Sequence, residues 1–226
     1  MAHLKKNILG NFSGKIGNIS SRIQKGNTIF SSLPDNFSKP MDENSILRRN
    51  KFKTSIKMNS AIFSSDILKT LWTGLTPVSM NYRNYLMKQN YKSLDNSNII
   101  TEATQLTPFV GTRFDFADFV LNDTNVKFDL DLNSFAFKND SLVISFILFQ
   151  FTSKVNDSLE DFSFALIESK ALQYSETNLY SFEVPLTDEA YAYNRFYNSK
   201  NILLSVITLN SEGAIANFSS SKLISL

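Results

Sequence analysis

The chain has 226 residues, a net charge of +2, no Cys and a single His, His3. Without Cys it can form neither a disulfide nor a thiolate nucleophile, and one His cannot build a His-based triad or a two-His metal site. Residues 1–60 carry eleven Lys or Arg against three Asp or Glu, a net charge of +8, whereas residues 61–226 carry twelve against eighteen, a net charge of −6. We expect no enzymatic activity, and a basic segment that binds a partner.

The first ten residues, which include Lys5 and Lys6, lack the apolar run of a secretory signal peptide. The longest apolar stretch, residues 142–151, is interrupted by Ser145 and Gln150 and is shorter than the roughly 20 residues of a membrane-spanning helix. We therefore expect a soluble protein that is made in the cytoplasm and has no membrane partner.

Residues 1–40 are predicted to form a basic, Gly-rich arm that contains a β-hairpin. Four of the seven glycines lie here, at positions 10, 14, 17 and 26. Strand-like runs at residues 15–24 and 28–33 flank a Gly-Asn pair at residues 26–27. Because Gly and Asn tolerate the backbone conformations of tight hairpin turns, we place the turn at this pair.

Side-chain alternation gives this hairpin two different faces. Ile19 and Ile23 are out of phase with the basic residue Arg22, and successive side chains of a strand point to opposite faces. We expect one apolar face and one polar, basic face.

Residues 41–92 are predicted to be helical. Asp42 is a good N-cap for a first helix, in which Phe52, Ile56 and Phe63 recur at helical spacing and predict the buried side. The basic residues of this helix, at positions 48, 49, 51, 53 and 57, lie mostly away from that stripe.

Two shorter helices are predicted to follow. Ser65 can cap the second helix, which ends at Gly74, and Thr76 and Pro77 can start the third. A polar, Asn-rich linker at residues 93–105 then leads to a separate domain.

From residue 106 the pattern changes to the period of two that is typical of strands. Residues 142–151 are almost continuously apolar, as in a central strand. The other predicted strands are residues 113–121, 126–132, 162–167, 179–184, 202–209 and 222–226, with a long aromatic-rich loop around residues 191–197. Such short strands predict an antiparallel β-sandwich of Ig-like size over residues 106–226. The fold class is therefore α+β, with an N-terminal β-hairpin and helices followed by this sandwich.

Two motifs suggest ligand sites but lack essential residues. Residues 10–15 resemble part of a phosphate-binding loop, but only three residues separate the glycines and Ile16 follows the Lys in place of Ser or Thr. Residues 129–140 resemble part of a calcium loop, but Ser134 replaces the turn-forming Gly, and strand alternation already accounts for Asp129 and Asp131. We expect no cofactor and no metal.

The basic N-terminal part remains as the candidate binding region. Its predicted partner-binding residues are Lys15, Ile16, Ile19, Arg22, Lys25, Phe30, Arg48, Arg49 and Lys53. The cations could neutralise nucleic-acid phosphates. They could equally bind an acidic surface of a neighbouring protein, including the acidic part of another copy.

The N-terminal third resembles an uncharacterised family found in Bacteroidota and in their phages or prophages. The resemblance lies in Gly-Asn-Phe-Ser-Gly-Lys-Ile-Gly-Asn at residues 10–18, in Arg49 and Phe52 on the helix after Pro40, and in Trp-Thr-Gly-Leu-Thr-Pro at residues 72–77. It covers roughly residues 4–90. Asp42 and Ser45 depart from it, standing where the family usually has Thr and Gln.

The resemblance implies a phage structural context and no established enzymatic activity. With the basic arm, it predicts a non-enzymatic structural or adaptor component of a large assembly, namely a phage or phage-like virion, that is oligomeric there. Its partners would be other structural proteins or further copies of itself. The alternative is a nucleic-acid-binding protein that uses the same basic arm.

Overall fold

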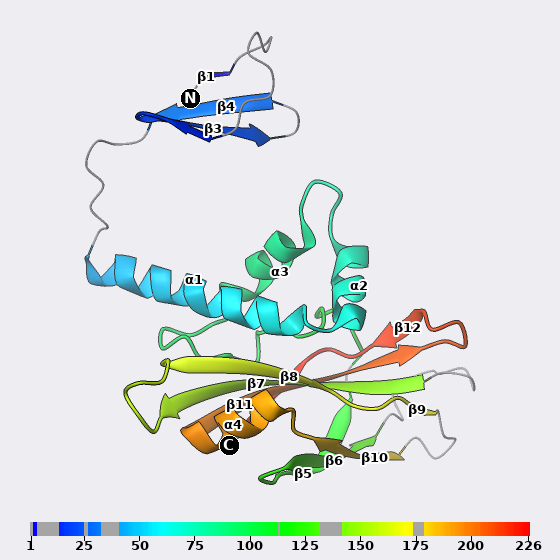
Figure 1. The fold of residues 1–226 in the computed structure, drawn as a ribbon. Coiled ribbons are helices and arrows are strands. Elements are labelled where there is room, and N and C mark those ends of the chain that lie inside the picture. Colours follow the sequence, from blue (N-terminus) through cyan, green and yellow to red (C-terminus); the bar gives the residue numbers. More distant parts are fainter. Residues whose placement is uncertain are drawn as a thin grey trace. The chain divides into compact units, whose positions relative to one another are not determined.

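The computed structural model describes seven stretches of the chain, which are residues 2–3, 14–24, 27–32, 41–112, 114–131, 142–173 and 179–226. They divide into two units, residues 1–46 and 47–226. The first unit is a small antiparallel sheet, and the second contains the helices and both sheets of the sandwich (Figure 1).

The N-terminal sheet contains the predicted hairpin. Its strands are β1 (Ala2–His3), β2 (Gly14–Ile16), β3 (Ile19–Gln24) and β4 (Asn27–Ser32), in the order β1-β4-β3-β2. Asn27 pairs with Gln24 and belongs to β4, so it is not part of the turn as predicted.

A second turn divides the run of residues 15–24, which we had predicted to be one strand. Ile16 pairs with Ile19 across Gly17 and Asn18. Gly17 has a φ of +56°, whereas Asn18 is not among the residues with positive φ. Positive φ at the first central residue only is the type II′ pattern, which favours Gly there and matches the twist of a hairpin. The glycine therefore ends β2 and starts a second hairpin.

The helical layer consists of α1 (Glu43–Ile62), α2 (Asp66–Leu75) and α3 (Tyr82–Asn90). Two of the predicted caps are confirmed: the Asp42 carboxylate accepts from Ser45 N at 2.9 Å, and Ser65 Oγ accepts from Leu68 N at 3.4 Å. The predicted start of the third helix is wrong. Thr76 is the C-cap of α2, and the Asn81 side chain caps α3 by accepting from Arg83 N.

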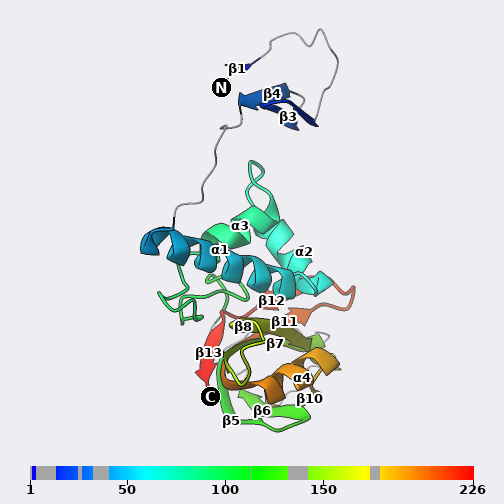
Figure 2. The same cartoon turned by 60° about the vertical axis from the view of Figure 1, so that its left-hand side comes forward.

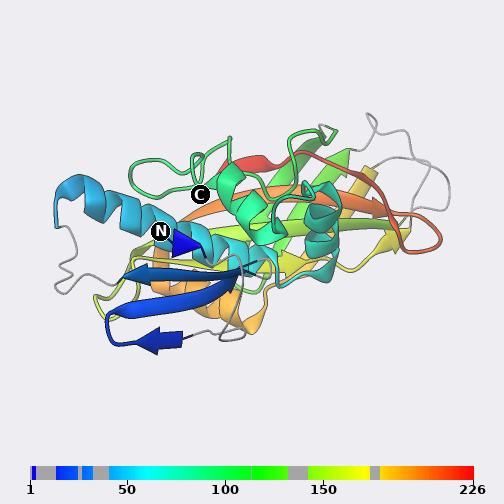
Figure 3. The ribbon, with the colours of Figure 1, turned by 90° about the horizontal axis from the view of Figure 1, so that it is seen from above.

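The predicted sandwich is confirmed as two antiparallel sheets. The smaller contains β5 (Asp115–Leu121), β6 (Asn125–Asp131) and β10 (Leu179–Pro185), in the order β10-β6-β5. The larger contains β7 (Leu142–Lys154), β8 (Phe162–Glu168), β9 (Leu172–Gln173), β11 (Tyr197–Leu209), β12 (Ile215–Phe218) and β13 (Lys222–Ser225), with the main order β12-β11-β7-β8. Figures 2 and 3 show α1, α2 and α3 on one face of this larger sheet, and Figure 2 shows the smaller sheet on the other.

The aromatic-rich segment that we predicted to be a loop forms helix α4 (Asp188–Phe196). The Thr187 side chain caps it by accepting from Ala190 N at 3.2 Å. Tyr193 packs on Phe151 of the sandwich core with ring centroids 5.5 Å apart. The aromatic residues follow a helical period here, which the strand pattern on either side had obscured.

Residues 93–105 are not a linker, and the helices and the sandwich do not form separate domains. Leu94 and Ile100 are buried in the core that the helices share with β7 and β11. Gln150 of β7 accepts from Ile100 N at 2.9 Å and donates to Asn98 O at 2.7 Å. The polar side chains that suggested a linker make hydrogen bonds inside the fold, and the division between units falls at residues 46–47 instead.

We expect the helical layer and the sandwich to unfold together. Phe149→Ala removes a fully buried side chain from the core between the two sheets and should cost about 3–5 kcal/mol. Trp72, the only Trp, is buried in the helical layer and reports on that layer by fluorescence. The denaturant midpoint measured by Trp72 fluorescence should fall by the same amount as the midpoint measured by circular dichroism. An unchanged Trp72 midpoint would restore the two-domain prediction, and Val78→Ala at an exposed position is the control.

Candidate partner-binding surface

The predicted residues of the arm fall on two faces of the N-terminal sheet. Ile19 and Ile23 lie on one face and are 50% and 43% exposed, and half-buried Phe30 lies on the same face, opposite Ser21. Lys15 and Arg22 lie on the other face and are exposed. The register therefore places Ile19, Ile23 and Phe30 on the face opposite Lys15 and Arg22, as the alternation predicted, but buried Ile29 pairs with Arg22 and shares the basic face.

Two predicted residues of this sheet cannot be placed in the same detail. Ile16 belongs to β2 and pairs with Ile19, but its side chain lies outside what the structure describes. Lys25 lies wholly outside the described residues.

The basic residues of α1 do not form one surface. Lys51 Nζ donates to Leu94 O at 2.6 Å and lies 5.6 Å from the centroid of the Tyr91 ring. Lys57 forms an ion pair with Glu160 and lies 5.2 Å from the centroid of the Phe162 ring. These two lysines act within the fold. The predicted Arg48, Arg49 and Lys53 are exposed on α1.

The apolar stripe that was predicted to be the buried side of this helix is largely exposed. Phe52 is 52% and Ile56 is 44% exposed, whereas Met58 and Ile62 are fully buried. Phe63, the last predicted member of the stripe, is half-buried. The predicted side is wrong because α1 carries apolar residues on two sides, and the packed one is the other.

Two hydroxyl side chains complete the buried side of α1. Thr54 and Ser55 are both fully buried and donate to the carbonyl oxygens of Asn50 and Lys51, four residues earlier, at 3.0 and 2.9 Å. With these bonds the hydroxyl groups can be buried without losing a hydrogen bond.

The exposed side of α1 combines apolar and basic residues. Arg49, Phe52, Lys53 and Ile56 occupy positions i, i+3, i+4 and i+7 and share one face. All four are exposed. We call them the α1 strip.

A groove of about 400 Å³ lies beside the α1 strip, between α1, β8 and α4. Its lining residues are Ile56, Lys57, Ser60 and Ala61 of α1, Ser64 just beyond that helix, residues 163–166 of β8, and Glu189 and Tyr193 of α4. Helix α1 runs alongside β8: Lys57 contacts Phe162 at the start of the strand, and Ser65 just beyond the helix donates to Glu168 at its end, 2.9 Å away. We call this hollow the β8 groove.

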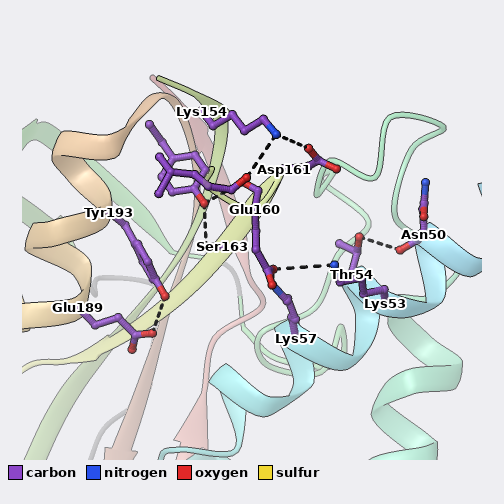
Figure 4. Close-up of polar contacts among 12 residues, drawn as sticks. Asn50, Lys53, Thr54, Lys57, Lys154, Glu160, Asp161, Ser163, Glu189 and Tyr193 are labelled. Atoms are coloured by element: carbon purple, nitrogen blue, oxygen red, sulfur yellow. Dashed lines mark hydrogen bonds and ion pairs between the residues drawn. The ribbon is translucent and has the colours of Figure 1, made fainter. Parts of the chain in front are cut away.

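Ion pairs and hydrogen bonds surround the β8 groove (Figure 4). Glu160 pairs with Lys57 and lies 4.0 Å from Lys53 Nζ, and the Tyr193 hydroxyl donates to Glu189 Oε1 at 3.0 Å. Partial burial lowers the pKa of Lys57, and the nearby charge of Lys53 lowers that pKa further. Burial raises the pKa of Tyr193, and the hydrogen bond to Glu189 raises it too. Tyr193 is therefore a neutral donor at physiological pH, and Glu189 is its acceptor.

A second and larger hollow lies between α2 and the β11–β12 hairpin. It has a volume of about 540 Å³ and is mostly apolar, with Ile67 and Leu71 on one side and Leu209, Ile215 and Phe218 on the other. It contains none of the residues that the sequence predicted for binding.

Two kinds of site are not found in the part of the chain that the structure describes. No group of three or more His, Cys, Asp or Glu could hold a metal ion. No helix there combines the length and apolar character needed to cross a membrane.

Sequence reasoning missed Glu189, Tyr193 and Ser60. Glu189 and Tyr193 were placed in or beside a loop, and Ser60 is an ordinary polar residue of a helix. The only part of the sequence pattern that pointed to this site was the helical spacing of Phe52 and Ile56, which we had predicted to be the buried side of α1.

Comparison of the chain with models of protein families, with curated proteins and with solved structures found no significant match. The resemblance of residues 4–90 to a phage-associated family therefore stays a prediction.

Replacing residues on the two sides of α1 should affect stability very differently. Met58→Ala removes a buried side chain and should cost about 2–5 kcal/mol in the free energy of unfolding. Phe52→Ala removes an exposed side chain and should change stability by about 0.5 kcal/mol or less. Urea titrations of both variants and of the parent chain measure these differences. A larger loss for Phe52→Ala would show that the stripe is packed after all.

Proposed function

We propose that this protein is a non-enzymatic structural or adaptor component of a large assembly, and that it binds neighbouring proteins through exposed apolar residues set among basic ones. The observation that carries the proposal is the α1 strip, in which Phe52 and Ile56 are exposed between Arg49 and Lys53. The N-terminal sheet of the first unit also exposes apolar side chains, Ile19 and Ile23, on the face opposite Lys15 and Arg22.

The physical basis is the burial of these apolar side chains in an interface. Removing apolar surface from water gains about 25 cal/mol per Å², and cations at the rim select an acidic neighbour. Each contact is small, but contacts repeated around a symmetric assembly act together. Two surfaces that each bind weakly are therefore sufficient for a component of such an assembly.

We further propose that the assembly is a phage or phage-like virion. The support for this is the resemblance of residues 10–18 and 72–77 to the phage-associated family. The protein would be made in the host cytoplasm and become part of the particle, beside other structural proteins or further copies of itself.

The alternative function is binding of nucleic acid by the basic residues, and one observation favours it. Lys15 and Arg22 share a face of the N-terminal sheet that is separate from the apolar one. Phosphate binding would need only that face and the exposed cations of α1.

Cross-linking mass spectrometry on native source material should identify the partner. We expect cross-links from Lys15 or Lys53 to another protein or another copy, because both lysines are exposed on the proposed surfaces. Nucleic-acid adducts at these lysines without any protein partner would support the alternative function instead.

Two sets of substitutions should separate the proposals. Phe52→Ser with Ile56→Ser should weaken assembly, while Arg48→Gln with Arg49→Gln and Lys53→Gln should leave it largely intact. If the three cations instead neutralise phosphates, the parent chain should lose roughly 40-fold in DNA affinity over a fourfold rise in salt, and the Gln variant should lose most of that salt dependence. Sedimentation velocity and DNA-binding titrations measure the two outcomes. Lys51 and Lys57 are left unchanged because both act within the fold.

A further inference from the structure

Strand β8 is an open edge of the larger sheet. Within the described residues it pairs only with β7. Ser169 N donates to Ser145 O at 2.9 Å just beyond the paired region. Because alternate residues of an antiparallel pair bond to the partner strand, Ala165 bonds to β7, whereas the N–H and C=O groups of Phe164 and Leu166 point outward.

These outward groups have no hydrogen bond within the described part of the chain. Proteins usually protect such an edge with Lys, Pro, a bulge or a covering segment. Strand β8 contains neither Lys nor Pro. Four consecutive residues of β8 line the β8 groove together with residues of α1 and α4, and β8 runs between these two helices (Figure 1). A free strand edge beside a groove is the arrangement that accepts an added strand.

The residues around the groove also favour one type of side chain on the added strand. In a parallel pairing, the residue opposite Ala165 would bond to both Phe164 and Leu166 through its own N–H and C=O, and its side chain would share the face of Ala165. Ala165 packs in the core between the two sheets, on the side of α4. The exposed carboxylate of Glu189 lines the groove on this side. The added strand therefore fits best with a Lys or Arg at this position.

The chain itself contains a strand with these properties. Strand β2 is an edge strand of the N-terminal sheet, and Lys15 is its central residue. Since Ile16 and Ile19 close the hairpin of β2 and β3, the N–H and C=O of Lys15 point away from β3. The opposite net charges of residues 1–60 and 61–226 also allow the basic part of one copy to attract the acidic part of another.

We propose that the β8 edge accepts strand β2 of a second copy in parallel, with Lys15 opposite Ala165 and its ammonium group against Glu189. This inference rests on the proposed function, because it names the partner as another copy and the surface as the β8 groove. It also gives a role to the Gly-Lys-Ile-Gly-Asn motif at residues 14–18: Lys15 contacts the neighbour, and the turn at Gly17 returns the chain into β3.

Zero-length carbodiimide cross-linking of a mixture of unlabelled and ¹⁵N-labelled full-length chains tests the contact directly. We expect a Lys15–Glu189 cross-link that joins a labelled to an unlabelled peptide. If this cross-link is absent, or forms only within one copy, the proposal is overturned.

Sedimentation velocity of full-length variants tests the contribution of the groove and of the ion pair. Ser60→Trp should fill the groove from its exposed wall and reduce self-association at least tenfold, whereas Ser60→Ala should not change it. Lys15→Glu and Glu189→Lys should each weaken self-association roughly fivefold, the upper end for one exposed ion pair, and the double variant should restore it. Circular dichroism confirms that each variant is folded.

The outcomes separate this inference from the proposed function. If Ser60→Trp and the charge reversals have no effect but Phe52→Ser with Ile56→Ser abolishes assembly, the β8 edge is not the site and the proposed function stands. If the full-length chain stays monomeric at all concentrations, the second-copy contact is overturned. If native cross-linking then also finds no protein partner, the proposed function fails as well.

Discussion

The larger unit depends on the pairing of β7 with β11, two long strands that are buried on both faces. Along β7, Phe146 and Leu148 pack against the helices, while Ile147 and Phe149 pack between the sheets. The same division holds on β11, where Leu203 faces the helices and Leu204 the sandwich. Each layer of the larger unit thus covers one face of this pair. Burial on both faces requires a continuous apolar run in place of alternation, which is why residues 142–151 read as they do.

This central pair was the most predictable part of the fold. An almost continuously apolar strand has few alternatives once its length excludes a membrane helix, and local capping by Asp42 and Ser65 depends on neighbouring residues alone. The Thr76–Pro77 pair was misassigned for the opposite reason. Thr and Pro can start a helix or end one, and here Thr76 Oγ1 donates back to Trp72 O at 2.6 Å, so it belongs to the end of α2.

The segment at residues 93–105 could not be predicted because its polar residues form hydrogen bonds with residues more than ten positions away in the chain. Buried Asn90 accepts from Gln105 N and donates to Gln105 O, both at 2.8 Å. Ser93 donates to Thr104 Oγ1 at 3.1 Å inside the same region. Read along the chain, these residues have the composition of a solvated linker. Only the fold shows that they are paired, and paired polar groups can be buried where unpaired ones cannot.

The candidate site was predictable in part. The sequence singled out the basic residues, but it could not show that Lys51 contacts Leu94 and Tyr91, or that Lys57 and Lys53 both lie close to Glu160. Nor could it show which side of α1 packs, since an apolar pattern on two sides of a helix fits two orientations equally well. Glu189 and the free edge of β8 come from distant parts of the chain and meet only through the sheet.

The exposed apolar residues of α1 are notable because other residues of the same helix make its core contacts. Single exposed apolar residues are common on proteins and need no special explanation. Phe52 and Ile56 differ because they lie one turn apart on a helix whose core contacts are already made by Met58 and Ile62. Both side chains remain exposed, and Ile56 lines the β8 groove beside the open edge of β8. The proposed added strand would satisfy the outward backbone groups of Phe164 and Leu166 and would also cover Ile56, which lines the same groove.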